Sequence, residues 1–371
     1  MTTLRVISNG YGEDAIAAQL IQAIGLDALD VQPIPLVGDG RSYVTLGLTP
    51  QLVQGVLPSG GFLRRFSDIF RDLRSGLLGQ FLNQRRVLST THGAYQLVVG
   101  DVFALLMATW RTTMPTVFFP TAKSERAIPH YAVECQLIRA NAQLVFPRDI
   151  ETHQRFQSAR VPSRFFGNPM FDGMASDAPK GDPPMVALLP GSRDEAVSNI
   201  RMMLTIVSKL TLESSFQFVF SLSNHIQLPE LQAAVADLPW TVHEHATGIE
   251  CTLSEPPLTV RGSYQFYDVL QSSSVVIGLA GTANEQAMHA QRQLISFIGM
   301  GPQSSRQRFR EQHQLIDGVS PILIDSNDVD EIATQLSHCL NTHSFPWTPL
   351  SDHAQSSARY IAACLRQEFF I

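Results

Sequence analysis

Short apolar runs that suit β-strands alternate with helical patterns along most of this 371-residue chain. In the first half, the alternation predicts four strand–helix pairs. Strands are expected over 4–8, 96–100, 116–119 and 142–146, and helices over 13–24, 103–110, 130–140 and 150–157. This order is typical of a parallel sheet covered by helices on both faces. The chain is therefore predicted to adopt an α/β fold.

A segment rich in glycine and proline, over 167–184, interrupts the alternation and predicts a linker. Beyond it, the pattern restarts. Strands are expected over 185–189, 216–221, 275–278, 293–298 and 321–324, and helices over 195–212, 264–271, 284–290 and 329–340. We predict two Rossmann-like domains, over 1–168 and 184–347, that face a ligand cleft at the carboxyl ends of their strands. The segment 348–371 is expected to form a helix that packs back on the N-terminal domain.

The charge and the cysteines exclude several classes of protein. A net charge of -6 argues against a nucleic-acid binder with a basic face. The four cysteines, Cys135, Cys251, Cys339 and Cys364, form no CxxC pair and indicate reduced thiols in a cytosolic protein. No stretch reaches the roughly 18 apolar residues that a membrane span needs, so any membrane role is predicted to be peripheral.

The first motif that suggests a ligand site is Pro190-Gly191-Ser192-Arg193. It follows an apolar strand and precedes a long amphipathic helix. Gly191 permits close approach of the backbone to a ligand. Ser192 is suited to cap the helix, and Arg193 to bind a phosphate through two nitrogens. The motif also fits an ordinary capped helix with a solvated arginine.

A second strand, turn and helix start follow over 275–285. Gly281 and Thr282 would offer backbone N–H groups and a hydroxyl to a diphosphate. Glu285, one turn into the helix, is placed to accept from both ribose hydroxyls. The alternative is a capping box, with Thr282 as N-cap and Glu285 at the third helical position.

The two motifs together resemble the nucleotide half of the lipid-A-disaccharide synthases. The resemblance extends through 142–146 and 161–168 to about residue 298, and the segment 8–14 is similar to the opening of the lipid-A-disaccharide synthase-related proteins. It implies an inverting, metal-independent transferase of the GT-B fold, with no cofactor, that moves a hexosamine-type sugar from UDP to a lipid or glycolipid. The nucleotide-sugar residues it implies are Gly191, Ser192, Arg193, Asn224, Gly281, Thr282, Asn284 and Glu285.

In the N-terminal half, the resemblance weakens. The strand over 97–100 is followed by Asp101, as in the family, but the Pro, Asp and Asn residues expected after it are missing. Inverting transfer needs a general base, and Asp101 at a strand's carboxyl end is a candidate, although it also fits a helix N-cap. Glu13 is the rival base, although it also fits a charge that complements the helix dipole. The acceptor is expected to meet Asn9, Gly10, Gly12 and Asp14.

The segment 62–88 combines six arginines with apolar residues at near-helical spacing. This pattern predicts an interfacial helix on an anionic membrane, at the inner face of the cytoplasmic membrane. A core-packed helix with solvated arginines is the alternative. The side chains expected to meet the membrane are Arg64, Arg65, Phe66, Phe70, Arg71 and Arg74.

Three other functions remain open. The segment Gly10–Ala15 satisfies the G-x-G-x-x-A motif of nicotinamide-dependent oxidoreductases, with Asp39 as the ribose-binding acid, but Glu13 and Asp14 would then repel the pyrophosphate. A UDP-sugar epimerase shares the fold but usually carries Ser-Gly-Gly near Gly281. A nucleotide-sugar-binding protein without a catalytic base is the third.

No metal site is predicted. Asp328-Val329-Asp330 matches a DxD motif, but it opens a helix, where capping is the better interpretation. His243-Glu244-His245 has alternating histidines without a third ligand nearby in the sequence, which favours an exposed strand.

Overall fold

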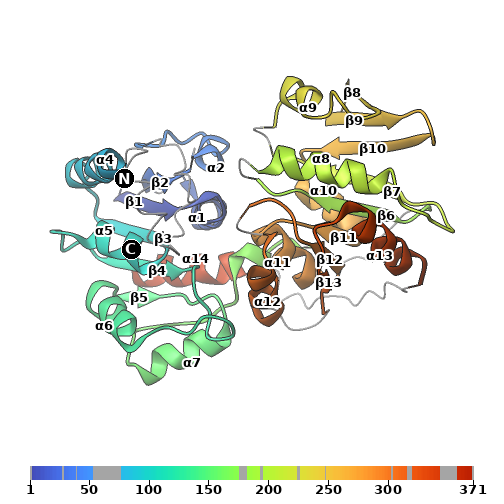
Figure 1. Ribbon diagram of the computed structural model, residues 1–371. Coiled ribbons are helices and arrows are strands. Elements are labelled where there is room, and N and C mark those ends of the chain that lie inside the picture. Colours follow the sequence, from blue (N-terminus) through green and yellow to red (C-terminus); the bar gives the residue numbers. More distant parts are fainter. Residues whose placement is uncertain are drawn as a thin grey trace. The chain divides into compact units, whose positions relative to one another are not determined.

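The computed structural model describes residues 2–26, 29–38, 40–52, 77–174, 182–192, 195–223, 226–246, 248–301, 304–315, 320–342 and 357–369, without the side chains of 77 and 78. The chain divides into two units (Figure 1). Unit 1 comprises Met1–Asp172 with His353–Ile371, and unit 2 comprises Gly173–Asp352. Each unit is a sheet flanked by helices, as the α/β prediction requires.

Unit 1 contains a fully parallel sheet of five strands. In spatial order, the strands are β2 (Leu29–Val37), β1 (Thr2–Asn9), β3 (Tyr95–Gly100), β4 (Thr116–Pro120) and β5 (Leu144–Val145). Its helices are α1 (Tyr11–Ile24), α2 (Arg41–Val44), α4 (Leu77–Thr90), α5 (Val102–Thr109), α6 (Ala132–Asn141), α7 (Ile150–Ser158) and α14 (Ser357–Glu368), with a short 3₁₀ turn at Pro169–Phe171.

Alternate residues of each strand in unit 1 face opposite layers of helices. Leu97 of β3 packs in a cluster with Leu20 of α1 and Ile361 of α14. Its neighbour Val98 packs with Leu105 of α5 on the other face. Because strand side chains alternate with a period of two, the nearly continuous apolar run of β3 is explained by burial on both faces.

The C-terminal helix α14 belongs to unit 1 and lies against α1. Both oxygens of the Asp172 carboxylate accept hydrogen bonds at its first turn, from the N–H of Ser357 at 2.8 Å and of Ala358 at 2.6 Å. This carboxylate therefore caps the helix from a distant part of the chain.

Unit 2 contains a mixed sheet of eight strands. In spatial order, they are β13 (Ile322–Ile324), β12 (Gln293–Phe297), β11 (Ser273–Gly278), β6 (Met185–Leu189), β7 (Gln217–Ser221), β10 (Leu258–Ser263), β9 (Gly248–Leu253) and β8 (Trp240–His245). Its helices are α8 (Ala196–Val207), α9 (Leu228–Ala234), α10 (Phe266–Ser272), α11 (Thr282–His289), α12 (Arg306–Leu315) and α13 (Val329–Thr342).

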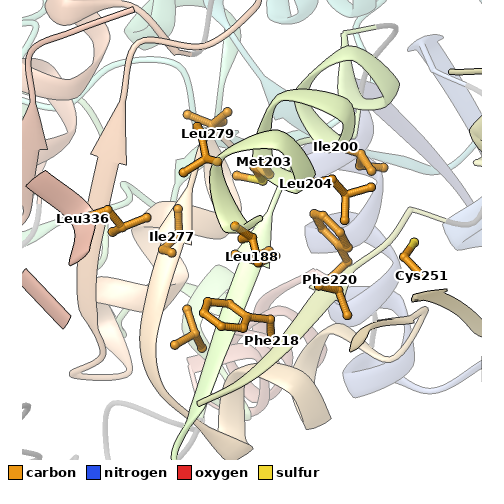
Figure 2. Close-up of a cluster of buried hydrophobic side chains, with 14 of the residues drawn as sticks. Leu188, Ile200, Met203, Leu204, Phe218, Phe220, Cys251, Ile277, Leu279 and Leu336 are labelled. Carbon is orange, nitrogen blue, oxygen red and sulfur yellow. The ribbon is translucent and has the colours of Figure 1, made fainter. Parts of the chain in front are cut away.

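The core of unit 2 lies between the central strands and α8. Figure 2 shows Leu188 and Ile277, from neighbouring strands, beside Met203 and Leu204 of α8. All four side chains are at most 1% exposed. Their burial holds α8 against the sheet.

The strands β8, β9 and β10 depart from the parallel sheet that the sequence predicts. β10 pairs in parallel with β7, but β9 is antiparallel to both β10 and β8. Only short turns separate these three strands, and a short turn joins antiparallel strands, whereas a parallel pair needs a long crossover. In the burial pattern of β9, Ile249, Cys251 and Leu253 face the core while their neighbours are partly exposed.

Among the described residues, no helix combines the length and apolar character needed to span a membrane.

Candidate functional site

The two predicted turns of unit 2 lie side by side. β6 and β11 are parallel neighbours, with Leu189 paired to Gly278, and the N–H of Leu279 donates to the carbonyl of Leu189 at 2.9 Å. The turns that follow these strands therefore share one carboxyl edge of the sheet. Gly191 in the first turn has a φ of 101°, a conformation that side chains of L-residues rarely adopt.

The second turn presents a helix N-terminus without a side-chain cap. Helix α11 begins at Thr282, its N-cap is Gly281, and no side-chain cap hydrogen bond forms. The capping box with Thr282 as N-cap and Glu285 as its partner is therefore not the arrangement found. The first N–H groups of a helix have no partner within the helix, so this end is suited to an anion.

Glu285 is buried within unit 2 and pairs with an arginine instead of capping α11. Its carboxylate is 3% exposed and accepts from the Arg308 guanidinium at 2.9 Å. Arg308 also lies 3.5 Å from the carboxylate of Glu311, one turn further along α12. This pairing holds Glu285 in a fixed position one turn below the N-terminus of α11.

Two buried polar side chains hydrogen-bond to the backbone of the second turn. Asn284 is fully buried, and its amide donates to the carbonyl of Gly278 at 3.3 Å. The Ser296 hydroxyl donates to the same carbonyl at 2.8 Å. A side chain at Gly278 would collide with Asn284, which explains the glycine at this position. Asn284, predicted as a ligand contact, thus holds the backbone of the turn.

A further buried amide connects the first turn to the loop after β12. Asn199 of α8 donates to the carbonyl of Pro190 at 2.9 Å and to that of Met300 at 3.4 Å. Its oxygen accepts from the N–H of Met300 at 2.8 Å. Asn199 is fully buried and was not identified from the sequence, because an asparagine inside a helical pattern carries no local sign of its tertiary partners.

The remaining residues predicted to bind the nucleotide-sugar are Ser192, Arg193 and Asn224. Ser192 is exposed and does not cap α8, whose N-cap is Glu195, so the predicted cap is wrong. Helix α8 begins at the buried Ala196, one residue after the predicted start at 195. Arg193 and Asn224 lie outside the described residues.

In unit 1, the candidate bases occupy neighbouring strand ends. Asp101 directly follows β3, and its carboxylate accepts from the N–H of Ala104 at 2.8 Å as the N-cap of α5. The capping interpretation is thus confirmed, while the base role stays a prediction. Burial raises the pKa of Asp101 above its ordinary value, although hydrogen bonds from Ala104 and Asn9 oppose the shift.

Glu13, the rival base, reaches across the sheet edge. Its carboxylate accepts from the Thr121 hydroxyl, which follows β4, at 2.8 Å. A side chain at Gly10 would approach the other Glu13 oxygen to 2.5 Å, so the carboxylate lies directly over this glycine. Gly12 is the second residue of α1. The G-x-G-x-x-A segment does follow a strand and form a turn and the start of a helix, but Glu13 places negative charge over the turn where a pyrophosphate would bind.

Asp14, predicted to meet the acceptor, faces the interior. It is 1% exposed, and its carboxylate accepts from the Ser8 hydroxyl at 2.5 Å. Ser8 in turn accepts from the Tyr43 hydroxyl at 2.6 Å. Burial, followed by the nearby Asp14 charge, raises the pKa of Tyr43 well above its ordinary value. Asp14 thus fixes the turn from β1 to α1 and lies behind the exposed edge.

Most of the predicted membrane segment falls beyond the described part of the chain, including Arg64, Arg65, Phe66, Phe70, Arg71 and Arg74; Asp39 does too. The described end of the segment forms α4. Its Leu88 packs into the core, whereas Leu82 is 64% exposed. The Arg85 guanidinium lies 4.8 Å from the ring centre of Trp110, which is 58% exposed.

The segments 328–330 and 243–245 form the helix cap and the exposed strand that the sequence predicts. The Asp328 carboxylate accepts from the N–H of Glu331 at 2.9 Å at the start of α13, which is a cap. His243 lies on β8, an edge strand, with its side chain exposed.

Comparison with known proteins identifies the fold through solved structures. No family model matches the chain, and no curated protein matches its sequence. Solved structures do match over nearly their whole length. The kitacinnamycin glycotransferase has a TM-score of 0.56 at 12% identity, with 99% of this chain and 98% of that chain covered. MurG of Acinetobacter baumannii has a TM-score of 0.53 at 11% identity, with 99% and 100% covered.

A UDP-GlcNAc 2-epimerase from Methanocaldococcus jannaschii, solved in complex with UDP-GlcNAc and UDP, has a TM-score of 0.53 at 12% identity, with 98% and 99% covered. These identities are too low to carry a function, but the likeness shows the fold. The chain has the GT-B fold of two Rossmann-like units, as predicted.

Proposed function

We propose that this chain is a glycosyltransferase that uses a UDP-sugar and binds the nucleotide in unit 2. The observation that carries the proposal is the pair of adjacent turns after β6 and β11, with the uncapped start of α11 at one of them. A helix N-terminus with free N–H groups stabilises a diphosphate both when it is bound and when it leaves. Transfer by this route needs no metal.

The diphosphate and the ribose of the donor each have a proposed partner. The diphosphate meets the backbone of Gly281 and Thr282, and the ribose hydroxyls donate to Glu285. The family resemblance adds Gly191, Arg193 and Asn224 to this set. The ion pair with Arg308 supports the ribose role, because it holds the Glu285 carboxylate in one orientation.

We expect Glu285→Gln to weaken UDP binding by about 1.5–3 kcal/mol, because the amide keeps a single acceptor oxygen and so loses one of the two charged hydrogen bonds from the ribose hydroxyls. Isothermal titration calorimetry of UDP measures the change. Glu311→Gln is the matched control, since Glu311 lies beside the same guanidinium. If the two variants lose UDP affinity equally, Glu285 acts only through Arg308. If Glu285→Gln binds UDP as tightly as the wild type does, Glu285 has no contact with the ribose.

The chemistry proposed for unit 1 is inverting transfer with Asp101 as general base and Glu13 as its alternative. A base must take the acceptor hydroxyl proton while the bond between sugar and phosphate breaks. Both carboxylates lie at the carboxyl edge of the sheet, and the raised pKa of Asp101 favours proton uptake. We place the acceptor at this edge, near Asn9 and Gly10.

A UDP-sugar epimerase is the second candidate, because UDP-GlcNAc 2-epimerases are among the solved structures that match almost the whole chain. The two functions differ in their products. A transferase releases UDP only when an acceptor is present, whereas an epimerase changes the configuration of the sugar without an acceptor. Incubation of UDP-hexosamines with and without total lipid extract, followed by UDP quantification and sugar analysis, separates them. Titration with NAD tests the oxidoreductase alternative.

We further propose that the acceptor is a lipid and that unit 1 meets the inner face of the cytoplasmic membrane. The support is the basic amphipathic pattern over 62–88. Its described end adds the exposed Leu82 and the Arg85–Trp110 pair. Aromatic and basic side chains together suit the headgroup region of an anionic bilayer.

The double variant Arg85→Glu/Arg86→Glu is expected to bind anionic liposomes at least about 30-fold more weakly, at roughly 1 kcal/mol per basic residue near the surface. Co-sedimentation at low salt measures the binding. Arg139→Glu/Arg261→Glu makes the same charge change at exposed positions elsewhere and should bind as wild type does. If the wild-type protein stays in the supernatant while such liposomes sediment, a soluble acceptor is favoured.

A further inference from the structure

A buried glutamine lies directly beneath the turn proposed to hold the diphosphate. Gln312 of α12 is 1% exposed. Its amide nitrogen lies 3.2 Å from the carbonyl oxygen of Ala280 and 3.0 Å from that of Gly281. The two carbonyls belong to consecutive residues, so one side chain holds two successive peptide groups of the turn.

The orientation of the Gln312 amide follows from its surroundings. Two carbonyl oxygens can only accept hydrogen bonds, so the NH₂ end must face them. The amide oxygen then faces the Asn284 nitrogen at 3.5 Å. Asn284 itself donates to Gly278, so the amides of Gln312 and Asn284 together hold the turn from Gly278 to Gly281.

Holding these carbonyls determines where the next N–H groups point. A trans peptide group is planar, with its C=O and N–H directed to opposite sides. Gln312 holds the carbonyl of Ala280, and it shares the carbonyl of Gly281 with the N–H groups of Asn284 and Glu285. Because both carbonyls face α12, the N–H groups of Gly281 and Thr282 are directed away from it. They are the groups that a diphosphate at the start of α11 would meet.

We infer that Gln312 is a positioning residue that presents the N–H groups of Gly281 and Thr282 to the diphosphate of the donor. The inference rests on the proposed nucleotide site. Gln312 touches no ligand atom in this role and acts only through the turn. It should therefore contribute to recognition of the diphosphate and not to recognition of the nucleoside.

The test compares UDP with uridine in Gln312→Met, which keeps the side-chain length and removes both hydrogen bonds. We expect UDP affinity to fall about tenfold, the loss of roughly one charged hydrogen bond, while uridine affinity stays within a factor of about two. Calorimetry measures UDP, and ligand-observed NMR measures uridine. Gln314→Met is the matched control on the same helix, because Gln314 is exposed.

Equal losses for UDP and uridine would show that Gln312 only supports the fold of the unit, and unchanged affinities would show that it has no role. Both outcomes overturn the inference. Absence of UDP binding by the wild type would instead overturn the proposed function.

A second measurement needs no variant. In wild-type protein labelled with ¹⁵N-glycine and ¹⁵N-threonine, UDP should shift the amide signals of Gly281 and Thr282 and slow their hydrogen exchange, while uridine should not. If neither amide responds to a UDP concentration that saturates the protein, the inference is wrong.

Discussion

Asp101→Asn is expected to lower turnover by about 10²–10⁴-fold, the range typical for loss of a general base, while UDP affinity and melting temperature stay close to those of the wild type. The structure makes this substitution informative because Asp101 also caps α5. Asparagine caps a helix about as well as aspartate, so the N–H of Ala104 keeps its acceptor. A loss of activity then reports on the carboxylate and not on the helix.

The pH dependence provides a second readout. Burial raises the pKa of Asp101, so the acid limb of kcat/KM should lie above the ordinary range of an aspartate. A raised pKa in the folded protein means that the contribution of Asp101 to stability is greatest below its unfolded pKa and is lost as pH rises through its folded pKa. At neutral pH, the neutral asparagine should therefore not destabilise the fold through charge.

Glu13→Gln is the companion variant. The hydroxyl of Thr121 can still donate to the side-chain oxygen of the glutamine, so the contact across the sheet edge is retained. Release of UDP in the presence of acceptor measures both variants. If Asp101→Asn turns over normally and Glu13→Gln does not, the two carboxylates have exchanged roles.

Asn199→Leu should strongly destabilise unit 2 and weaken UDP binding. The leucine removes the donor to the carbonyl of Pro190, a buried contact, and the acceptor of the Met300 N–H, a partly buried contact. Each buried group left without a partner costs about 1–3 kcal/mol. The melting temperature should fall by roughly 2–4 °C per kcal/mol, as measured by differential scanning calorimetry. UDP binding should weaken because the turn at Pro190 loses its connection to the loop at Met300.

Asn341→Leu is the control for this variant. Asn341 also makes two hydrogen bonds to backbone, with Thr211 and Glu213, but at the end of α13. It should lose some stability and keep the UDP affinity of the wild type. Equal losses of UDP affinity in the two variants would show that the effect is general destabilisation of the unit.

Most of the strands and helices, and the two turns after β6 and β11, can be read from the sequence because they depend on local patterns. The apolar runs that became β3, β6 and β11 are long enough, and bounded clearly enough by glycine and polar residues, to be recognised without tertiary information. Parallel neighbours end at the same edge of a sheet. Turns after such strands are therefore brought together whatever side chains they carry.

Other features were decided by contacts between residues far apart in the chain. The predicted helix over 195–212 ends at Val207 in the structure. The backbone of Thr211 is instead held by Ser337 and Asn341 of α13, at 3.0 Å each. Similarly, the sequence pattern predicts no strands over 248–263, and the antiparallel pairing of β8, β9 and β10 is seen only in the sheet.

The same division holds for the candidate site. The sequence alone placed glycines, Thr282 and Glu285 at a helix start and Asp101 at a strand end, since these positions follow from the local alternation. Only the tertiary structure showed that Asp14 and Asn284 face inward and that Asn199 and Gln312 hold the turns. The physical reason is that burial and hydrogen-bond partners depend on what packs against a residue, and a linear pattern records only which residues share a face.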